Sequence, residues 1–419
     1  MNDMRYIITE YCHRDVKGIL SFSLDAKTDK MESVNFTSYD QYNDSITIGD
    51  IFVAKVLNVS KQIQAAFILY APDQKGYLPI HADYTPIITN RRYDGRILAG
   101  DEILVQLEKE AVRTKEPVFT MNLSLAGRYS VISYANTYKG VSKKCTKIER
   151  EQLRAAIPQE LDYGVVIRTN AASLLQPSET EQPADLLQPV KEEIRYLNQR
   201  MTVLIQEGIH RTCFSRIWQS PPVYLTKLRD EGAASQQVIT DHRVLYDELK
   251  DFAALYMPEL SANISLYQDA SYPLQKLYRV ETHLSELLSR KVWLKSGAYL
   301  IIEKTEAMYV IDVNSGKNIT RKETTEYIYQ INHEAAQEIM RQIRLRNLTG
   351  MILIDFINME EQCRIDALLQ ELRILAKKDP IQTTVVDITA LGLVEITRRK
   401  TTKSLAEQLI IHQYQEALK

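Results

Sequence analysis

The stretch that decides the fold of the C-terminal part of the chain is MYVIDVNSG, at residues 308–316. Its apolar run leads directly into Asp312, as in a buried strand that ends on a polar side chain. A second run of this kind, MILID at residues 351–355, leads into Asp355. Two strands joined by one crossover helix run parallel, and their carboxyl ends meet at the sheet edge where open α/β sheets bind ligands. The two runs therefore predict Asp312 and Asp355 side by side.

The segment between these runs is predicted to be one long amphipathic helix. Between Thr324 and Arg346, apolar residues recur at helical spacing and define a single buried face. Gly350 is expected to end this helix, just before the next strand. With further apolar runs at 298–302 and 385–388, the block from about residue 286 to 400 is predicted to be α/β. The apolar helix positions are Ile328, Ile331, Ala335, Ile339 and Ile343.

Two carboxylates at one sheet edge, with the amide of Asn314 nearby, suit a hard cation that prefers oxygen ligands. Mg²⁺ takes one or two carboxylates together with water and phosphate oxygens, and a bound metal lowers the pKa of its water. The pattern is therefore compatible with metal-assisted chemistry on a phosphodiester. Spacing alone also leaves a plainer interpretation open, because an acidic residue after a strand often caps the following turn.

The N-terminal half has a different pattern. The first 46 residues alternate like strands separated by polar turns, and from Gly49 short β runs follow each other closely. Closely spaced strands with turn signals between them predict a small closed barrel. Residues 173–189 are rich in Pro, Ser, Glu and Gln, and we expect a loop or linker there. Residues 190–260 are expected to be mainly helical, with a break at Pro221-Pro222.

Composition narrows the class of protein without naming a function. The 419 residues indicate two to four domains, and 45% hydrophobic with 25% charged residues is ordinary for a globular protein. There is no apolar run of the roughly 18 residues that a membrane span needs, and the N-terminus lacks a secretory pattern. A net charge of −2 neither predicts nor excludes a nucleic-acid partner, which would need basic patches.

The four cysteines lie far apart and form no CxxC pair, which argues against a zinc ribbon and against a disulfide framework. Their distribution is typical of a reducing cytoplasm, and we expect a cytoplasmic protein that binds no zinc. They are Cys12, Cys145, Cys213 and Cys363.

The motifs around the acidic pair are more specific than its spacing. They are SRKVWLKSG (289–297), EA (306–307), DVNSG (312–316), NHEAA (332–336), RQIRLR (341–346), IDFI (354–357), LGLVE (391–395) and TR (397–398). In order and spacing they resemble the catalytic domain of the RNase E/G family of endoribonucleases. The resemblance implies that Asp312 and Asp355 bind catalytic Mg²⁺, with Mn²⁺ as an alternative metal, and that Asn314 hydrogen-bonds within the site.

The resemblance covers nearly the whole chain and implies a multidomain α/β protein. It implies an S1 barrel, which is an OB fold, inserted in an RNase H-like subdomain, followed by a 5′-sensor region and a DNase I-like catalytic subdomain. The expected boundaries are 1–46 plus 224–285 for the RNase H-like subdomain, 47–122 for the S1 domain, 123–223 for the 5′-sensor region, 286–400 for the catalytic subdomain and 401–419 for a C-terminal tail.

The resemblance also assigns RNA contacts in the barrel. Phe67 and Tyr77 fall where the family places base-stacking aromatics, and Lys109 and Lys115 where it places lysines that contact the backbone. Barrels of this kind combine such aromatics with a basic groove. Taken alone, Phe67 would be read as a core residue of an alternating strand, and a loop lysine as a solvated surface charge.

A sensor for the 5′-monophosphate of RNA is implied by Gly127, Val131, Arg168 and Thr169. The planar guanidinium of Arg168 can donate two hydrogen bonds to one phosphate, and Thr169 adds a hydroxyl. The backbone at Gly127 and Val131 is expected to line the pocket. Without the resemblance, Arg168 would be a strand-end charge facing water.

The sequence departs from the family pattern in three places. The CPxCxG zinc-link, which joins protomers in the family, does not occur, so a homo-oligomer without a zinc-link, or a monomer, is expected. Asn358 stands where the family usually has a second acidic residue after Asp355, and this removes one charge near the expected metal. Asn318 and Ile319 replace smaller residues.

The resulting expectation is an endoribonuclease that cuts single-stranded RNA by Mg²⁺-dependent hydrolysis, favoured by a 5′-monophosphate. By resemblance, its substrates are ribosomal RNA precursors and messenger RNA in a bacterial cytoplasm. Two alternatives stay open. One is a catalytically impaired RNA-binding member of the same family, and the other is a scaffold protein of a degradation complex.

Overall fold

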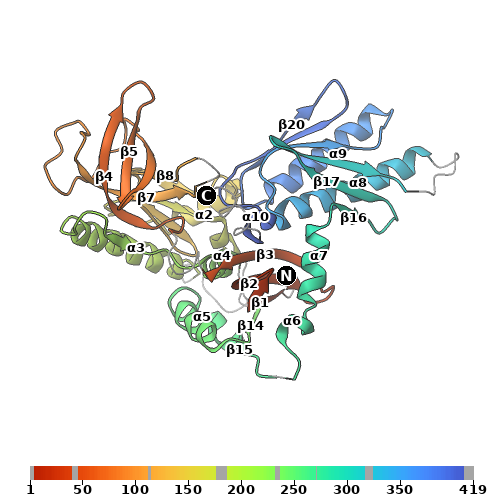
Figure 1. The fold of residues 1–419 in the computed structure, drawn as a ribbon, viewed down its shortest axis with the longest axis horizontal. Helices are drawn as coiled ribbons and strands as arrows, with labels where there is room; N and C mark the ends of the chain where they lie inside the picture. Colours follow the sequence, from red (N-terminus) through yellow and green to blue (C-terminus); the bar gives the residue numbers. More distant parts are fainter. Residues whose placement is uncertain are drawn as a thin grey trace. The chain divides into compact units, whose positions relative to one another are not determined.

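The structure is a computed structural model that describes residues 4–39, 46–111, 115–175, 186–231, 236–269, 271–316 and 324–409. The chain divides into two compact units (Figure 1). Each unit has its own sheets and its own buried core. The first unit holds Met1–Tyr42, Ser235–Leu249 and Ala262–Lys419, and the second holds Asn43–Ala234 and Lys250–Ser261.

A six-stranded mixed sheet forms the C-terminal part of the first unit, in the order β16-β17-β18-β19-β21-β20. Strands β18 and β19 are parallel and are joined by α8, so the predicted strand, helix and strand are confirmed. The other neighbouring strands are antiparallel. The elements are β16 (Lys291–Trp293), β17 (Tyr299–Lys304), β18 (Met308–Asn314), α8 (Thr324–Leu345), β19 (Gly350–Asp355), α9 (Gln362–Lys377), β20 (Thr383–Ile388) and β21 (Val394–Arg398).

The two faces of this sheet differ. Tyr309, Ile311 and Val313 of β18 are buried, whereas Asp312 and Asn314 alternate with them and lie on the opposite face. Helices α8 and α9 pack on the buried face, where each large aliphatic side chain stabilises the fold by about 1.5–3 kcal/mol. The predicted face of α8 includes the fully buried Ile331, Ala335, Ile339 and Ile343.

The end of α8 differs from the prediction. The helix ends at Leu345, and Asn347 adopts the left-handed conformation with a φ of 49°. Gly350 instead begins β19, with a φ of 91° that favours glycine. The expectation that Gly350 ends the helix was therefore wrong, because an asparagine takes the left-handed position after the helix. Its side chain is fixed there, since Arg398 Nη1 donates to Asn347 Oδ1 at 2.7 Å.

A second sheet of the first unit combines the start of the chain with a later segment. Its order is β15-β14-β1-β2-β3, with β14 parallel to β1 and to β15. The core beneath it is completed by Leu405 and Leu409 of the short C-terminal helix α10. The elements are β1 (Met4–His13), β2 (Val16–Asp25), β3 (Met31–Ser38), β14 (Gln237–Thr240), α5 (Arg243–Tyr256), β15 (Ile264–Leu266), α6 (Leu274–Leu277), α7 (Val280–Leu288) and α10 (Leu405–Leu409).

The second unit contains a closed five-stranded barrel, which confirms the expected barrel. Strands β4, β5, β6, β8 and β7 pair in that order, and β7 pairs back with β4. A short strand, β13, adds to β4. The barrel is filled by buried side chains such as Phe52, Ile68 and Phe119. The strands are β4 (Ile51–Ser60), β5 (Ala65–Ala71), β6 (Gln74–Pro79), β7 (Glu102–Lys109), β8 (Val118–Thr120) and β13 (Arg216–Trp218).

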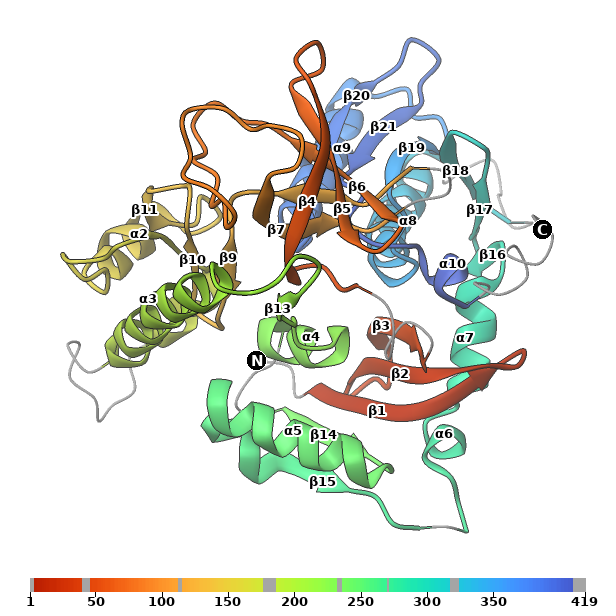
Figure 2. The ribbon, with the colours of Figure 1, turned by 60° about the vertical axis from the view of Figure 1, so that its left-hand side comes forward.

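The rest of the second unit is a four-stranded sheet, β11-β12-β10-β9, with α3 packed beside β9 and β10 (Figure 2). Helix α3 begins inside the expected linker, with Pro189 in its first turn, where proline is tolerated. Residues 176–185 of that linker lie outside the described ranges. The elements are β9 (Ser124–Ala126), β10 (Ser130–Ser133), β11 (Lys139–Val141), α2 (Lys147–Arg154), β12 (Gly164–Ile167), η1 (Thr169–Leu175), α3 (Gln188–Gly208), α4 (Val223–Glu231) and η2 (Pro258–Asn263).

Across the described parts of the chain, we find no helix with the length and apolar character needed to cross a membrane.

Candidate active site

Three predicted residues meet on the open face of the C-terminal sheet. Asp312 of β18 and Asp355 of β19 are register partners on neighbouring parallel strands, whose backbones lie about 4.8 Å apart. Asn314 lies two residues further along β18 on the same face, and its Nδ2 donates to Asp312 Oδ2 at 2.7 Å. Asp312 is half-buried and Asp355 is exposed. The sequence thus placed the two carboxylates and the amide correctly relative to each other.

The negative charge of this pair is not balanced by a positively charged side chain among the described residues. Within the described ranges, no Lys, Arg or His nitrogen forms an ion pair with Asp312 or Asp355. Two adjacent carboxylates repel each other, and a cation between them removes that repulsion. The described residues contain no cluster of three or more His, Cys, Asp or Glu side chains suited to a metal. Two carboxylates, with an amide oxygen beside them, nevertheless fit a hard cation that completes its shell with water and phosphate oxygens.

Helix α8 holds the segments that flank this pair. The buried Asn332 donates from Nδ2 to the Ile357 carbonyl at 2.7 Å and accepts from the Ile357 N–H at 3.1 Å. This exchange fixes the backbone that follows Asp355. Two residues further on, the Glu334 carboxylate accepts from the backbone N–H groups of Lys295 and Ser296 and fixes the turn between β16 and β17. The NHEAA motif therefore has a positioning role that the sequence did not reveal.

Of the residues that depart from the family pattern, Asn358 lies close to the site, and the others lie outside the described residues. Asn358 is exposed in the segment after β19, and a Cβ atom on Gly392 would lie 4.0 Å from its Oδ1. Gly392 has a φ of 84° in the turn before β21. Asn358 therefore lies against that turn and contributes an amide where a carboxylate was expected. Asn318 and Ile319 lie outside the described residues.

In the barrel, three of the four predicted RNA contacts form one row across the strands. Phe67 of β5 pairs with Tyr77 of β6, and their ring centroids lie 5.9 Å apart at 69°. Tyr77 and Lys109 each pair with Val118 of β8. Phe67 is half-buried, while Ala66 and Ile68 beside it are fully buried, so the ring lies outside the barrel core. Lys115 is exposed and has no place in this row.

The four predicted sensor residues lie at one end of the β9, β10 and β12 strands. Val131 of β10 pairs with residues of both β9 and β12. Arg168 follows β12 directly, and its Nη1 donates to the Gly127 carbonyl at 2.8 Å. Thr169 is exposed at the start of η1. The structure therefore brings Gly127, Val131 and Arg168 together and leaves Thr169 open beside them.

Arg168 already has an anionic partner. Its Nη1 lies 2.6 Å from Asp230 Oδ1, an oxygen that also accepts from Arg229 Nε at 2.8 Å. Burial alone would raise the pKa of the Asp230 carboxyl, but the hydrogen bond from Arg168 and the charges of both arginines lower it below its ordinary value. Burial likewise opposes the charge of Arg168, yet Asp230 raises the pKa of Arg168. The sequence missed Asp230 because it lies 62 residues from Arg168.

A neighbouring set of donors is also satisfied from within the unit. The Glu193 carboxylate of α3 accepts from the backbone N–H groups of Arg128 and Tyr129 at 2.7 and 2.9 Å, and from Ser130 Oγ at 2.8 Å. A carboxylate thus fills a cradle of donors that suits an anion.

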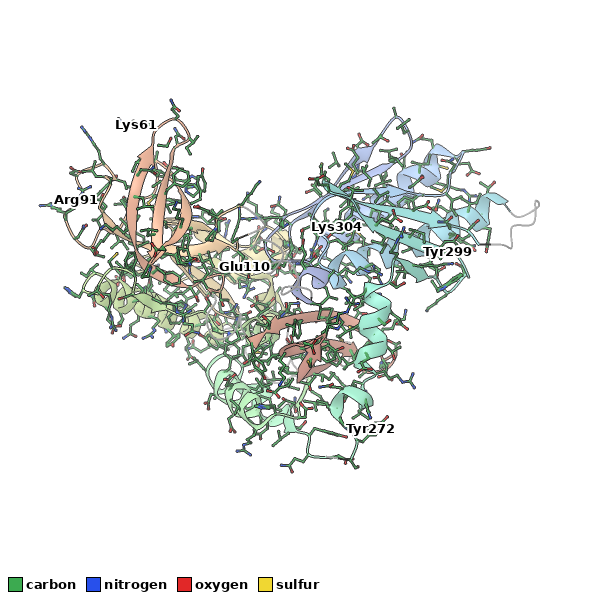
Figure 3. The ribbon with its side chains drawn as sticks, in the orientation of Figure 1. Lys61, Arg91, Glu110, Tyr272, Tyr299 and Lys304 are labelled. Carbon is green, nitrogen blue, oxygen red and sulfur yellow. The ribbon has the colours of Figure 1, made fainter. Side chains whose placement is uncertain are left out.

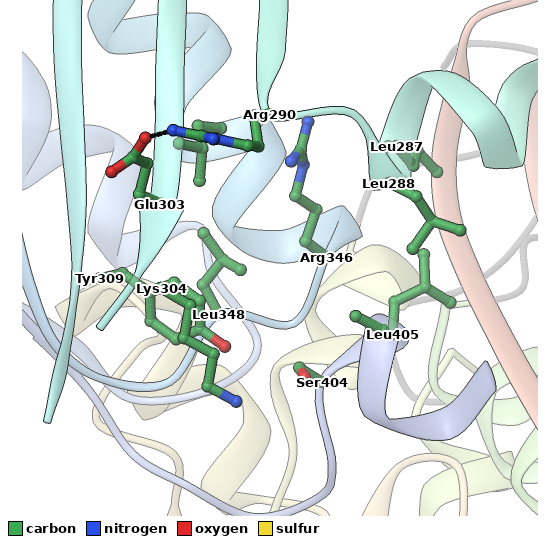
Figure 4. A pocket seen from close by; sticks show the side chains of 12 residues that line it. Leu287, Leu288, Arg290, Glu303, Lys304, Tyr309, Arg346, Leu348, Ser404 and Leu405 are labelled. Carbon is green, nitrogen blue, oxygen red and sulfur yellow. Dashed lines mark ion pairs between the residues drawn. The ribbon is translucent and has the colours of Figure 1, made fainter. Parts of the chain in front are cut away.

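A cavity of about 480 Å³ lies at the other end of the β17–β18 hairpin (Figure 4). It is bordered by an ion pair between Arg290 and Glu303 and by the buried Arg346. Arg346 donates from Nη1 to the Ser289 carbonyl, but its Nη2 has no hydrogen-bond partner among the described residues. Burial lowers the pKa of Arg346 to about 10. Asp312 is not among the residues around this cavity.

Taken together, a barrel, a mixed α/β sheet and a pair of facing carboxylates define a protein with an acidic site that suits a hard cation. Comparison with known proteins gives the family. The sequence profile described as the Ribonuclease E/G family matches residues 124–401, about two thirds of the chain. The chain therefore belongs to the Ribonuclease E/G family.

Individual relatives cover most of the chain. Ribonuclease G of Escherichia coli strain K12 is 31% identical over 378 residues, which is 86% of this chain and 74% of that protein. Ribonuclease G of Haemophilus influenzae is 31% identical over 376 residues, with the same coverage. Ribonuclease E of Nostoc sp. strain PCC 7120 is 31% identical over 372 residues, which is 86% of this chain and 52% of that protein.

Proposed function

We propose that this protein is an endoribonuclease that cleaves single-stranded RNA by hydrolysis dependent on a divalent metal, with Mg²⁺ as the metal. One observation carries the proposal: Asp312 and Asp355 face each other in register on neighbouring parallel strands, with Asn314 bonded to Asp312. The pair has no ion-pair partner among the described residues, and the chain belongs to a family whose named relatives are ribonucleases.

In the proposed mechanism, Asp312 and Asp355 hold the cation, and Asn314 orients the Asp312 carboxylate through its Nδ2. A bound divalent cation supplies a water of lowered pKa and stabilises charge on the phosphodiester. Asn332 and Glu334 keep the flanking segments in place, so that the acidic pair needs no rearrangement before substrate binds. Cleavage leaves 5′-phosphate and 3′-hydroxyl ends.

Single-stranded RNA is the proposed substrate because stacking needs bases that are not paired. The row of Phe67, Tyr77 and Lys109 offers two rings and a cation on one barrel face, the combination that binds single strands without sequence preference. Lys115 adds an exposed charge. Ribosomal RNA precursors and messenger RNA in the cytoplasm are the proposed physiological substrates.

A 5′-monophosphate is proposed to bind at Arg168 and Thr169, with Gly127 and Val131 lining the pocket. The phosphate would compete with Asp230 for the Arg168 guanidinium, whose Nη1 donates to Asp230 Oδ1 at 2.6 Å in the ligand-free protein. Sensing is therefore an exchange of one anion for another.

The domain assignment is part of the same proposal. Strands from both ends of the proposed RNase H-like subdomain share one sheet, which supports grouping 1–46 with 224–285. The remaining proposed parts are the S1 domain at 47–122, the 5′-sensor region at 123–223, the DNase I-like catalytic subdomain at 286–400 and a tail at 401–419.

The experiment is cleavage of a fluorescent, A/U-rich single-stranded RNA bearing a 5′-monophosphate, with Mg²⁺ and with chelator. Wild type is compared with Asp312→Ala and with Asp387→Ala, an exposed aspartate on β20 of the same sheet that serves as the matched control. We expect internal cutting that needs Mg²⁺, is lost in Asp312→Ala and is retained in Asp387→Ala. Mg²⁺ should also raise the unfolding temperature of wild type but not of Asp312→Ala.

A second candidate function is an RNA clamp without catalysis, favoured by Asn358 in place of a carboxylate. It predicts that wild type binds the RNA but does not cut it at any Mg²⁺ concentration. Binding would then be the same in Asp312→Ala. That result would replace the nuclease proposal.

A further inference from the structure

Two aromatic side chains lie on the same open sheet face as the acidic pair. Trp293 of β16 and Tyr299 of β17 are register partners, with ring centroids 5.3 Å apart at 61°. Trp293 is 63% exposed. Figure 3 labels Tyr299 and Lys304, which mark the two ends of β17. A tryptophan so open to water at a sheet edge offers a ring face for a partner.

A lysine is held against both rings. Lys291 Nζ lies 3.8 Å from the Trp293 centroid and 3.8 Å from the Tyr299 centroid. A cation in this position is stabilised by both ring quadrupoles. In the described part of the chain its ammonium group has no carboxylate partner, so its charge remains available to an anion.

The register connects these residues to the carboxylates in two cross-strand rows. One row runs from Trp293 through Tyr299 to Asn314. The next runs from Lys291 through Ile301 and Asp312 to Asp355. Because neighbouring strands are about 4.8 Å apart, the Tyr299 backbone is one strand away from Asn314. The aromatic pair and the acidic pair are therefore parts of one continuous surface.

We propose that Trp293, Tyr299 and Lys291 form a nucleotide-binding subsite beside the acidic pair. A base of the RNA strand stacks on the exposed aromatic rings, and Lys291 contacts the adjoining phosphate. This contact places the next phosphodiester over Asp312 and Asp355. The inference rests on the proposed nuclease function and adds the residues that position the strand at its site.

The surface favours a nucleotide over an apolar protein partner. A fixed ammonium group on the rings would have to be buried without a counter-charge by an apolar partner, whereas a phosphate pairs with it. The barrel carries a similar set of side chains, two rings and a lysine, in Phe67, Tyr77 and Lys109, which there share one cross-strand row. Lys291 and Trp293, but not Tyr299, also border a cavity of about 1550 Å³ within the first unit.

The first test measures the fluorescence of Trp293. The chain has two tryptophans, Trp218 and Trp293, so Trp218→Phe leaves Trp293 as the single tryptophan, which is excited selectively at the red edge of the absorption band. Its emission is measured during titration with the 5′-monophosphorylated RNA in chelator, so that no cleavage occurs, while anisotropy of labelled RNA reports binding. We expect quenching that follows the binding curve. Binding without any change in Trp293 emission would overturn the subsite.

The second test separates positioning from chemistry. Trp293→Ala should raise KM about tenfold, since loss of one stacked base contact weakens binding by roughly 5- to 150-fold, and kcat should change less than about twofold. Trp293→Phe should restore most of the affinity. The matched control is Tyr272→Ala, an exposed aromatic of the same unit that lies outside the rows and should leave KM unchanged.

Lys291→Ala should weaken binding and lower the salt dependence of affinity by about one phosphate contact. The outcomes distinguish the two proposals. If wild type quenches on binding but never cuts, the nuclease proposal fails and the subsite stands. If wild type cuts and Trp293→Ala has unchanged KM, the subsite fails and the nuclease proposal stands.

Discussion

The acidic pair of the C-terminal sheet and the ion-paired cluster of Arg168, Arg229 and Asp230 differ in whether their charges are balanced within the protein. Within the described residues, Asp312 and Asp355 have no cationic partner. Arg168 and Arg229 both pair with Asp230. The first site gains free energy when a cation arrives, because repulsion is relieved. The second must give up an existing ion pair to bind a phosphate. Of these two sites, only the acidic pair therefore has an unbalanced charge when no ligand is bound.

The largest expected effect is kinetic. Asp355→Asn should lower kcat/KM for RNA cleavage about 10²–10³-fold, because several kcal/mol of metal-assisted stabilisation is lost. Asp230→Asn should leave kcat for 5′-hydroxyl RNA unchanged and alter only the preference for a 5′-monophosphate. Steady-state kinetics on matched 5′-phosphate and 5′-hydroxyl substrates measure both. Equal losses in the two variants would contradict the contrast between the sites.

Acid should lower the stability of the folded protein by protonating carboxylates that are paired within it. Burial would raise the pKa of Glu407, but Lys304 and the Ser404 backbone N–H hold it at about 2, against an ordinary value of 4.5. A carboxyl with a lowered pKa contributes stability above about pH 4.5 and loses it as the pH falls toward 2. Because the Lys304–Glu407 pair is partly exposed and screened by solvent, we expect the free energy of unfolding to fall by about 1 kcal/mol across this window.

Glu407→Gln should flatten that part of the profile, measured by urea unfolding at stepped pH. The matched control is Glu306→Gln, an exposed glutamate of the β17–β18 hairpin, which should leave the slope unchanged. A Glu407→Gln profile with the wild-type slope would show that other carboxyls carry the acid sensitivity.

Asp230→Ala should lower the free energy of unfolding by about 2 kcal/mol, because two arginines lose their common partner. This figure lies between the values for surface and buried pairs, since the side chains of Arg168 and Asp230 are 24% and 34% exposed. Asp94→Ala removes an aspartate that is 61% exposed and should cost much less than Asp230→Ala. Equal losses of stability in the two variants would mean that the ion pairs of Asp230 with Arg168 and Arg229 do not stabilise the fold.

The smallest effect has the opposite sign. Asp312→Asn should raise the stability of the metal-free protein by about 0.5–1 kcal/mol, because one of two adjacent charges is removed. The Asn314 hydrogen bond can remain, since the new amide oxygen still accepts it. Unfolding is measured in chelator and again with Mg²⁺, which should reverse the order of stability. A less stable Asp312→Asn variant in chelator would contradict an unrelieved repulsion between the two carboxylates.

The local sequence pattern was sufficient to predict that the two aspartates lie together, but not to predict which residues surround them. Apolar runs and helical spacing fix strand, helix and strand, and these alone bring Asp312 next to Asp355. The aromatic pair escaped prediction because β16 has only three residues and its pairing with β17 is tertiary information. Asp230 escaped for a similar reason, as no periodicity links it to Arg168. Asn332 was quoted in a motif, yet its contact with Ile357 is visible only in three dimensions.

The core under the N-terminal sheet links the first described strands to the last described helix. Leu405 and Leu409 complete a core that contains Leu20 and Phe36, and the Phe36 N–H donates to Gln408 Oε1, 372 residues away. At a synthesis rate of about 5–20 residues per second, β1–β3 leave the ribosome roughly 20–70 s before α10 exists. During that interval their core lacks Leu405 and Leu409. The core under the N-terminal sheet is therefore complete only after residue 409 has been made, and faster elongation shortens the interval in which it is incomplete.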